Sequence, residues 1–251
     1  MILNKNKTTK KNNYLIIGGD GFVGNYLFKN LKKRQNTIYR TSRRKKFRTI
    51  RSAKTIYFDL QNIKDLSFLK KYNSILICAG INGIKNCENN KKLSQEINVN
   101  SITKIINFLN NNSIHYVFFS STQVYKNPYL KNSIDTKLEP QNLYGTQKMK
   151  IEKKINKECG LIIRPAKIVE KYNDNFFKSY FIKKKKIFDI NTNYKIFFTD
   201  IKKLTVQIDK YLVQKKTGIV DFSSNRKFSI LYLAKKYLKN FKELKNIFKK
   251  L

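Results

Sequence analysis

Glycine is concentrated at one point of the chain. Four of the nine glycines, Gly18, Gly19, Gly21 and Gly24, fall within seven residues. The apolar residues 14–17 precede them, and residues 22–31 follow with apolar side chains at helical spacing, which predicts a strand, a tight turn and a helix. Glycine suits such a turn because the backbone must bend sharply and leave bare N–H groups at the helix N-terminus, where they can face a pyrophosphate. The cluster therefore predicts a dinucleotide-binding turn rather than an ordinary one.

The net charge of +38 first suggests a nucleic-acid partner. The basic residues, however, are 46 Lys against 8 Arg, and Lys is spread along nearly every segment. Proteins that read nucleic acids rely on Arg for paired contacts with bases and phosphates. The composition therefore predicts no specific nucleic-acid partner.

Cysteine and histidine usage limits the remaining classes of protein. Cys78, Cys87 and Cys159 are odd in number and lack CxxC spacing, which predicts reduced thiols and a cytoplasmic location. His115 is the sole histidine, so we expect no metal site and assign it a structural role. No stretch approaches the roughly 18 apolar residues of a membrane span, so no membrane insertion is expected. Residues 1–13 read as a basic, solvated tail rather than a secretory signal.

Strand-like and helix-like segments alternate along the rest of the chain. Strands are expected over residues 37–41, 55–60, 75–79, 114–125 and 161–165, and helices over residues 93–109 and 148–159. Their period near 30 residues predicts an α/β fold, a Rossmann-like doubly wound parallel sheet. We expect an NAD(P)-binding domain over residues 14–165 and a small C-terminal substrate-binding lobe over residues 166–251, interleaved with the last sheet strand at about residues 194–224.

The end of the second strand bears on cofactor choice. In a doubly wound fold, an acidic residue there favours a ribose 2′-hydroxyl and Arg favours a 2′-phosphate. The candidates are Ser42, Arg43 and Arg44, with no carboxylate nearby in the sequence. We therefore expect NADP(H) to be preferred, with NAD(H) also accepted, although any position of so basic a chain is prone to carry Lys or Arg.

Several motifs occur in a fixed order. They are GGDGFVG at 18–24, Asp-Leu at 59–60, CAG at 78–80, NVNSITKIINFL from Asn98, SSTQVY at 120–125, YGTQK at 144–148 and RPAKIV at 164–169. In this order they resemble the extended short-chain dehydrogenase/reductases, which include nucleotide-sugar epimerases, dehydratases and 4-keto reductases. Later segments, 197–212 and 217–238, are similar to the family's closing elements.

The resemblance implies a catalytic group of Ser121, Tyr144 and Lys148. Three other tyrosines, Tyr180, Tyr211 and Tyr232, also precede a Lys by four residues, so position in the motif order selects Tyr144. Phenol and ammonium at i and i+4 share one helix face, and the Lys charge is expected to lower the pKa of the Tyr. Tyr144 would then exchange a proton with the substrate, whose oxygen Ser121, or its neighbour Thr122, would hydrogen-bond.

The resemblance also implies a cofactor site. Its residues are the glycine loop and helix start, the ends of three strands, and the catalytic pair: Gly18, Gly21, Phe22, Val23, Gly24, Arg43, Asp59, Leu60, Ala79, Gly80, Asn98, Tyr144 and Lys148. We expect the Asp20 side chain to point outward and Cys78 to pack in the interior.

Departures from the family pattern narrow the reaction. Thr122 and Gln123 stand where the family's dehydratases carry Asp-Glu, which argues against 4,6-dehydration. The segment after Pro165 is short, and Lys167, residues 183–186 and Arg226 are candidates for a substrate diphosphate or simply for a solvated face.

These patterns predict an NAD(P)-dependent oxidoreductase or epimerase of a nucleotide-activated sugar, acting by 4-keto reduction or C4 epimerisation in surface-polysaccharide precursor synthesis. A non-catalytic NAD(P)-binding sensor or scaffold is the alternative. A homodimer is left open.

Overall fold

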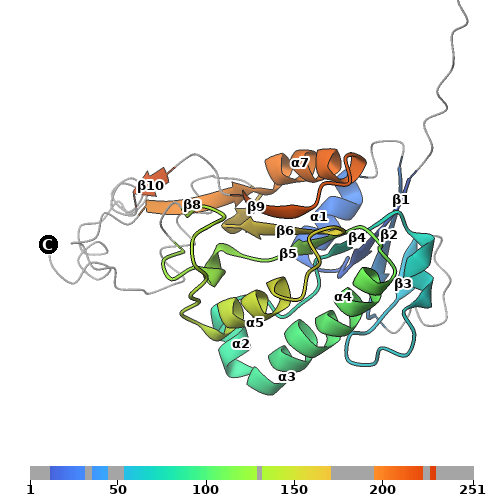
Figure 1. Ribbon diagram of the computed structural model, residues 1–251, viewed down its shortest axis with the longest axis horizontal. Helices are drawn as coiled ribbons and strands as arrows, with labels where there is room; N and C mark the ends of the chain where they lie inside the picture. The colour runs from blue at the N-terminus through green and yellow to red at the C-terminus, as the bar shows by residue number, and fades with distance from the viewer. Residues whose placement is uncertain are drawn as a thin grey trace, which may run out of the picture.

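Seven parallel strands form the central sheet of the computed structural model, which describes residues 12–31, 36–44, 54–128, 132–170, 195–222 and 227–229 (Figure 1). The strands are β1 (Asn13–Ile17), β2 (Thr37–Ser42), β3 (Thr55–Tyr57), β4 (Ser74–Ile77), β5 (Tyr116–Phe119), β6 (Gly160–Pro165) and β9 (Gly218–Phe222). Their order is β3-β2-β1-β4-β5-β6-β9, and every pairing is parallel. The predicted Rossmann-like doubly wound sheet is confirmed.

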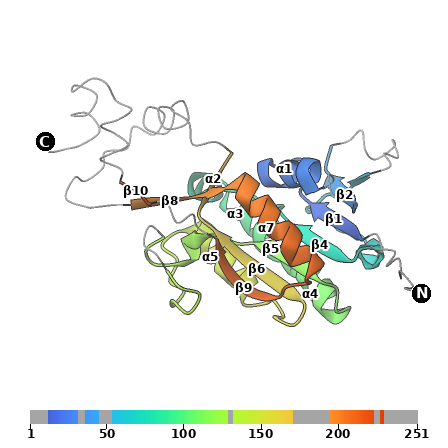
Figure 2. The same cartoon turned by 90° about the horizontal axis from the view of Figure 1, so that it is seen from above.

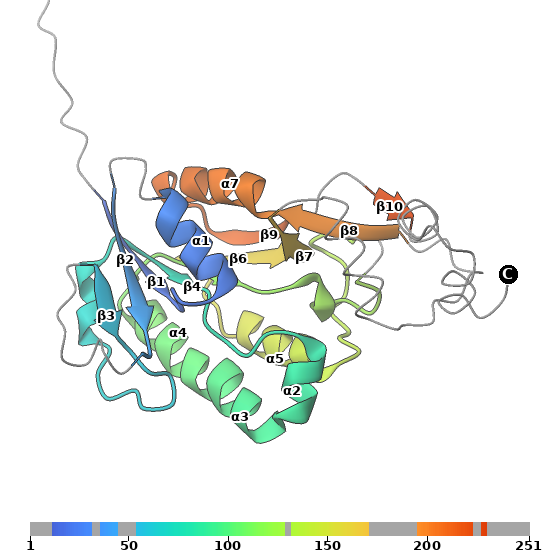
Figure 3. The ribbon, with the colours of Figure 1, turned by 180° about the vertical axis from the view of Figure 1, so that it is seen from behind.

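Helices cover both faces of this sheet (Figures 1 and 3). One face carries α1 (Phe22–Leu31) and α7 (Ile201–Val213), and the other carries α4 (Ile102–Asn111) and α5 (Leu143–Glu152) beside α2 (Ile84–Asn89) and α3 (Lys91–Gln95). Alternate residues of β1 serve the two cores: Ile16 packs in the cluster of α1 and α7, and Leu15 in the cluster of α4. Both faces are buried, which explains why the strands are apolar throughout.

A second, three-stranded sheet lies beyond one end of the main sheet (Figure 2). It consists of β7 (Lys167–Val169), β8 (Lys195–Asp200) and β10 (Lys227–Ser229), with β8 in the middle. Asp200 ends β8 and caps α7, because its Oδ1 accepts hydrogen bonds from the N–H groups of Lys202 (2.8 Å) and Lys203 (3.1 Å). Some predictions concern residues that the structure does not describe: the basic tail over 1–11, the diphosphate candidates 183–186 and 226, and the closing element over 230–238.

Several predicted elements have different bounds in the structure. The strands expected over 55–60 and 75–79 end at Tyr57 and Ile77. The expected helix over 93–109 is divided into α3, a π-helical stretch (Glu96–Ser101) and α4. The strand expected over 114–125 ends at Phe119, and a 3-10 turn (Thr122–Val124) follows. The helix expected over 148–159 begins earlier, at Leu143, and ends at Glu152, because Asn142 caps its N-terminus by accepting a hydrogen bond from the N–H of Gly145 (2.8 Å).

His115 precedes β5 and has two structural partners. Its Nδ1 lies 2.8 Å from the Ser74 hydroxyl, and its Nε2 lies 3.0 Å from the carbonyl oxygen of Lys216. Burial lowers the pKa of this imidazole.

Across the described ranges, no helix has both the length and the apolar character needed to cross a membrane.

Candidate active site

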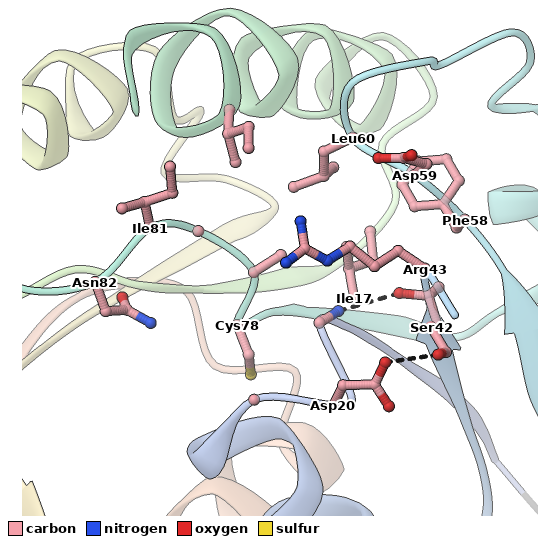
Figure 4. A pocket seen from close by; sticks show the side chains of 16 residues that line it. Ile17, Asp20, Ser42, Arg43, Phe58, Asp59, Leu60, Cys78, Ile81 and Asn82 are labelled. Carbon is pink, nitrogen blue, oxygen red and sulfur yellow. Dashed lines mark hydrogen bonds between the residues drawn. The ribbon is translucent and has the colours of Figure 1, made fainter. Parts of the chain in front are cut away.

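A cavity of about 330 Å³ opens at the carboxyl ends of β1, β2 and β4, where the strand order reverses (Figure 4). Ligands of doubly wound folds bind at this point. Seven residues of the predicted cofactor site line the cavity: Gly18, Gly21, Arg43, Asp59, Leu60, Ala79 and Gly80. The structure thus brings together the glycine loop and the ends of three strands, and Arg43 extends its side chain into the space between them.

Gly18 shapes the cavity floor. Its φ is +90°, and a Cβ at this position would lie 2.6 Å from both the Cα and the nitrogen of Ala79. Its N–H donates to Thr41 Oγ1 (3.1 Å), which ties the loop to β2. Only glycine therefore lets the ends of β1 and β4 approach so closely.

Six of the predicted cofactor residues do not line the cavity: Phe22, Val23, Gly24, Asn98, Tyr144 and Lys148. The first three form the start of α1. Asn98 lies in the π-helical stretch, where its amide is 5% exposed. Its Oδ1 accepts from the N–H of Ile81 (2.7 Å), and its Nδ2 donates to the carbonyl of Ile81 (2.9 Å) and to Gln147 Oε1 (2.8 Å). Asn98 thus joins the loop that forms one cavity wall to α5.

The expectation that Asp20 points outward is wrong. Its carboxylate turns toward the end of β2, where Oδ2 accepts a hydrogen bond from the Ser42 hydroxyl (2.6 Å), and it lines the cavity (Figure 4). The Arg44 Nε lies 3.6 Å from its Oδ1. Sequence reasoning missed this carboxylate because Asp20 and Ser42 are 22 residues apart and meet only when β1 and β2 pair.

Ser121, Tyr144 and Lys148 lie near one another beyond the cavity. Ser121 lies close enough to the Tyr144 phenol to lower its pKa, and the Lys148 Nζ lies 5.7 Å from the centre of the Tyr144 ring. None of the three lines the cavity, but Lys148 interacts electrostatically with Cys78, a residue of the cavity wall. Cys78 also packs against the core on the α1 side of the sheet, as predicted.

The start of α5 brings Tyr144 to Ser121. Asn142, the N-terminal cap of α5, donates from Nδ2 to Gln123 Oε1 (3.0 Å). Gln123 in turn donates its backbone N–H to the Ser121 hydroxyl (3.2 Å). Gln123, which stands where dehydratases carry an acid, therefore connects the turn after β5 to the cap of the helix that holds Tyr144 and Lys148.

Burial governs the protonation of the two candidate catalytic groups. Burial lowers the pKa of Lys148 to about 8, and the charges of Cys78, Cys87 and Glu152 oppose this shift. Its Nζ donates to the Phe119 carbonyl (2.8 Å). Burial raises the pKa of Tyr144, and only the neighbouring Ser121 hydroxyl opposes this shift. The expectation that Lys148 lowers the pKa of Tyr144 is therefore wrong for these positions, because the ammonium is turned toward a carbonyl oxygen.

A buried polar network, which the sequence did not predict, lies behind the catalytic group. Glu152 accepts hydrogen bonds from the Ser120 hydroxyl and from Arg164, whose Nη2 is 2.7 Å away. Arg164 Nη1 donates to the Tyr125 hydroxyl (2.7 Å), and that hydroxyl donates to Asp221 Oδ2 (2.7 Å). The network joins β5, α5, β6 and β9. Glu152 is one helical turn beyond Lys148, so the network supports the helix at the level of its candidate catalytic residue.

The sequence over residues 14–164, more than half of the chain, matches the model of the NAD dependent epimerase/dehydratase family. The chain belongs to this family. The assignment agrees with the predicted resemblance to the extended short-chain dehydrogenase/reductases. A comparison with curated proteins finds no significant match.

Solved structures share the fold of this epimerase/dehydratase family member. A hypothetical dTDP-4-dehydrorhamnose reductase from Sulfolobus tokodaii is similar with a TM-score of 0.72 and 21% identity, over 91% of this chain and 82% of that chain. The dTDP-4-dehydrorhamnose reductase from Bacillus anthracis in complex with NADP has a TM-score of 0.69 and 19% identity, over 91% and 80%. For the UDP-N-acetylglucosamine 4-epimerase from Bacillus cereus the values are 0.65 and 17%, over 92% and 83%.

Proposed function

We propose that this protein is an NADP(H)-preferring oxidoreductase or epimerase of a nucleotide-activated sugar, with Ser121, Tyr144 and Lys148 as its catalytic residues. The observation that carries the proposal is the grouping of Ser121, Tyr144 and Lys148 next to a cavity at the switch point of the sheet. Ser121 lies beside the Tyr144 phenol, and the Lys148 Nζ lies 5.7 Å from the centre of the Tyr144 ring. Proteins of the same fold include sugar-nucleotide reductases and a 4-epimerase, which supports this substrate class.

The residues around the cavity fit a nicotinamide dinucleotide. Gly18 and Gly21 line the cavity without side chains, so a diphosphate could approach the backbone of the glycine loop closely. Arg43 lines the cavity beside the end of β2, where it would meet a 2′-phosphate. Arg43 is the basis for proposing NADP(H) as the preferred cofactor. When bound, the cofactor supplies or accepts a hydride.

The same three residues could serve 4-keto reduction or C4 epimerisation. Since burial raises the pKa of Tyr144, its phenol keeps its proton near neutral pH. A protonated phenol can donate to the carbonyl oxygen of a 4-keto sugar while hydride arrives at the carbon, which yields an alcohol. Ser121 would hydrogen-bond the same oxygen, and Lys148 would hold the nicotinamide ribose, as the family resemblance implies. C4 epimerisation employs the same three residues but must first remove a proton from a hydroxyl.

A substrate panel tests the proposal. Nucleotide-activated sugars and their 4-keto derivatives are incubated with reduced or oxidised cofactor, and the products are separated by chromatography and read by mass. A gain of two hydrogens identifies reduction, and an isomer of unchanged mass identifies epimerisation. Either product would support a role in the synthesis of surface-polysaccharide precursors.

The Tyr144→Phe variant separates an enzyme from a sensor or scaffold. We expect it to lose turnover by at least about 100-fold, the range of general acid catalysis, while still binding cofactor. Tyr211→Phe is the matched control, because Tyr211 also precedes a Lys by four residues but lies in α7 on the other face of the sheet. Equal activity in both variants would contradict the catalytic role of Tyr144.

A further inference from the structure

The end of β2 carries a carboxylate that belongs to a different segment. In this fold the acidic residue that receives the adenosine ribose hydroxyls normally ends β2 itself. Here β2 ends at Ser42, and Asp20 reaches from the glycine loop to accept the Ser42 hydroxyl at 2.6 Å. Both residues line the cavity (Figure 4). The fold thus restores an acidic group to a place where the sequence of the strand has none.

The positive charges nearby leave this carboxylate only partly neutralised. Arg44 Nε lies 3.6 Å from Asp20 Oδ1, but the Arg44 side chain is 63% exposed, so the pair is weak and screened by solvent. The Arg43 side chain extends into the cavity. Among the described residues, Arg43 forms no ion pair with Asp20. One carboxylate and one guanidinium therefore lie at the same end of the cavity.

These two groups discriminate between cofactors in opposite directions. A 2′-phosphate carries more than one negative charge, so Arg43 attracts it and Asp20 repels it. A 2′-hydroxyl is neutral and can donate a hydrogen bond to a carboxylate. The Asp20 side chain is 26% exposed and fixed by Ser42, so its position does not depend on a ligand.

We propose that Asp20 is a cofactor-specificity residue that limits the preference for NADP(H), so that the protein binds both NADPH and NADH. This rests on the proposed binding of a nicotinamide dinucleotide in the cavity. It adds to that proposal a second determinant of cofactor preference, which acts against Arg43 and lies in a segment that is not adjacent to the end of β2 in the sequence.

The test is the ratio of dissociation constants for NADPH and NADH, measured by fluorescence titration at fixed ionic strength. Asp20→Asn should shift the ratio toward NADPH by about tenfold, since it removes one unit charge from a partly buried site without changing the shape of the side chain. Arg43→Ala should shift it toward NADH. Asp135→Asn is the matched control: it removes the same charge from an exposed residue that does not line the cavity, and we expect a shift in the ratio of under about threefold, because solvent and salt screen charges on the open surface.

The outcomes separate the two proposals. If neither cofactor binds the wild-type protein, the proposed function fails. If both bind and Asp20→Asn leaves the ratio unchanged, or shifts it no more than Asp135→Asn does, Asp20 is not a specificity residue. Loss of both cofactors in a folded Asp20→Asn protein would also refute the inference, since it would give Asp20 a general role in the loop. Asp20→Ser is a second variant that must show the same shift toward NADPH.

Discussion

Removing one partner of the buried ion pair between Glu152 and Arg164 should strongly destabilise the protein. The two side chains are each 3% exposed, and Arg164 Nη2 lies 2.7 Å from Glu152 Oε2. Glu152→Gln leaves the Arg164 guanidinium buried without a counter-charge, which costs about 3–5 kcal/mol. In a chain of this size each kcal/mol lowers the melting temperature by about 2–4 °C, so we expect a decrease of roughly 6–20 °C.

Urea denaturation followed by circular dichroism measures the loss. The control is Glu139→Gln, which breaks the surface pair with Lys126 (3.2 Å, side chains 46% and 71% exposed) and should cost under about 1 kcal/mol. The double variant Glu152→Met with Arg164→Met leaves no unpaired charge, so its loss should be smaller than the sum of the two single losses. A loss below about 1 kcal/mol for Glu152→Gln, or additive losses in the double variant, would refute this account of the network.

Two further changes have results that the structure fixes in advance. Gly18→Ala should abolish cofactor binding and destabilise the fold, because its Cβ would meet Ala79 at 2.6 Å. Gly83→Ala is the control: Gly83 shares a φ of +90° but has open space around it, so the variant should lose only about 1 kcal/mol of folding free energy. Equal losses of stability in the two variants, measured by thermal denaturation, would show that backbone strain alone matters. Lys148 releases its proton near pH 8 in the folded state but near its ordinary pKa of 10.5 when unfolded, so the unfolded state binds more protons between these values and stability rises with pH there. Lys148→Met should remove this rise. In urea titrations, the free energy of unfolding of the wild type relative to the variant should grow by about 3 kcal/mol from pH 8 to pH 10.5. A difference that stays constant over this range would contradict the lowered pKa of Lys148.

Local patterns predicted the fold and the cavity well, because they report which faces of each segment are buried. The apolar runs located β1, β4 and β6, and the glycine cluster located the turn that forms the cavity floor. Contacts between distant segments were not predictable in this way. Asp20 was assigned to solvent because nothing in the sequence indicates that Ser42 lies beside it. Likewise, the network of Glu152 and Arg164 exists only because α5 lies against β6.

The chemistry of the candidate catalytic pair shows a second limit. The i, i+4 spacing correctly placed Tyr144 and Lys148 on one helix, but the direction of the pKa of Tyr144 depends on burial and on where the ammonium points. Spacing along a helix contains neither quantity. The π-helical stretch is similar: its apolar periodicity resembles an ordinary helix, and the wider turn is visible only from the partners of Asn98.

The Asn98 side chain connects the cavity wall to α5. One amide binds both the N–H and the carbonyl of Ile81 in the cavity wall, and also Gln147, the residue next to Lys148 in α5. Gln147 continues the chain of contacts to Ser94 (2.8 Å). Direct hydrogen bonds therefore connect the cavity wall to the helix that carries Tyr144 and Lys148. Hydride donor and proton donor would meet the substrate in a fixed register, and a substitution at Asn98 would disturb both at once without touching either.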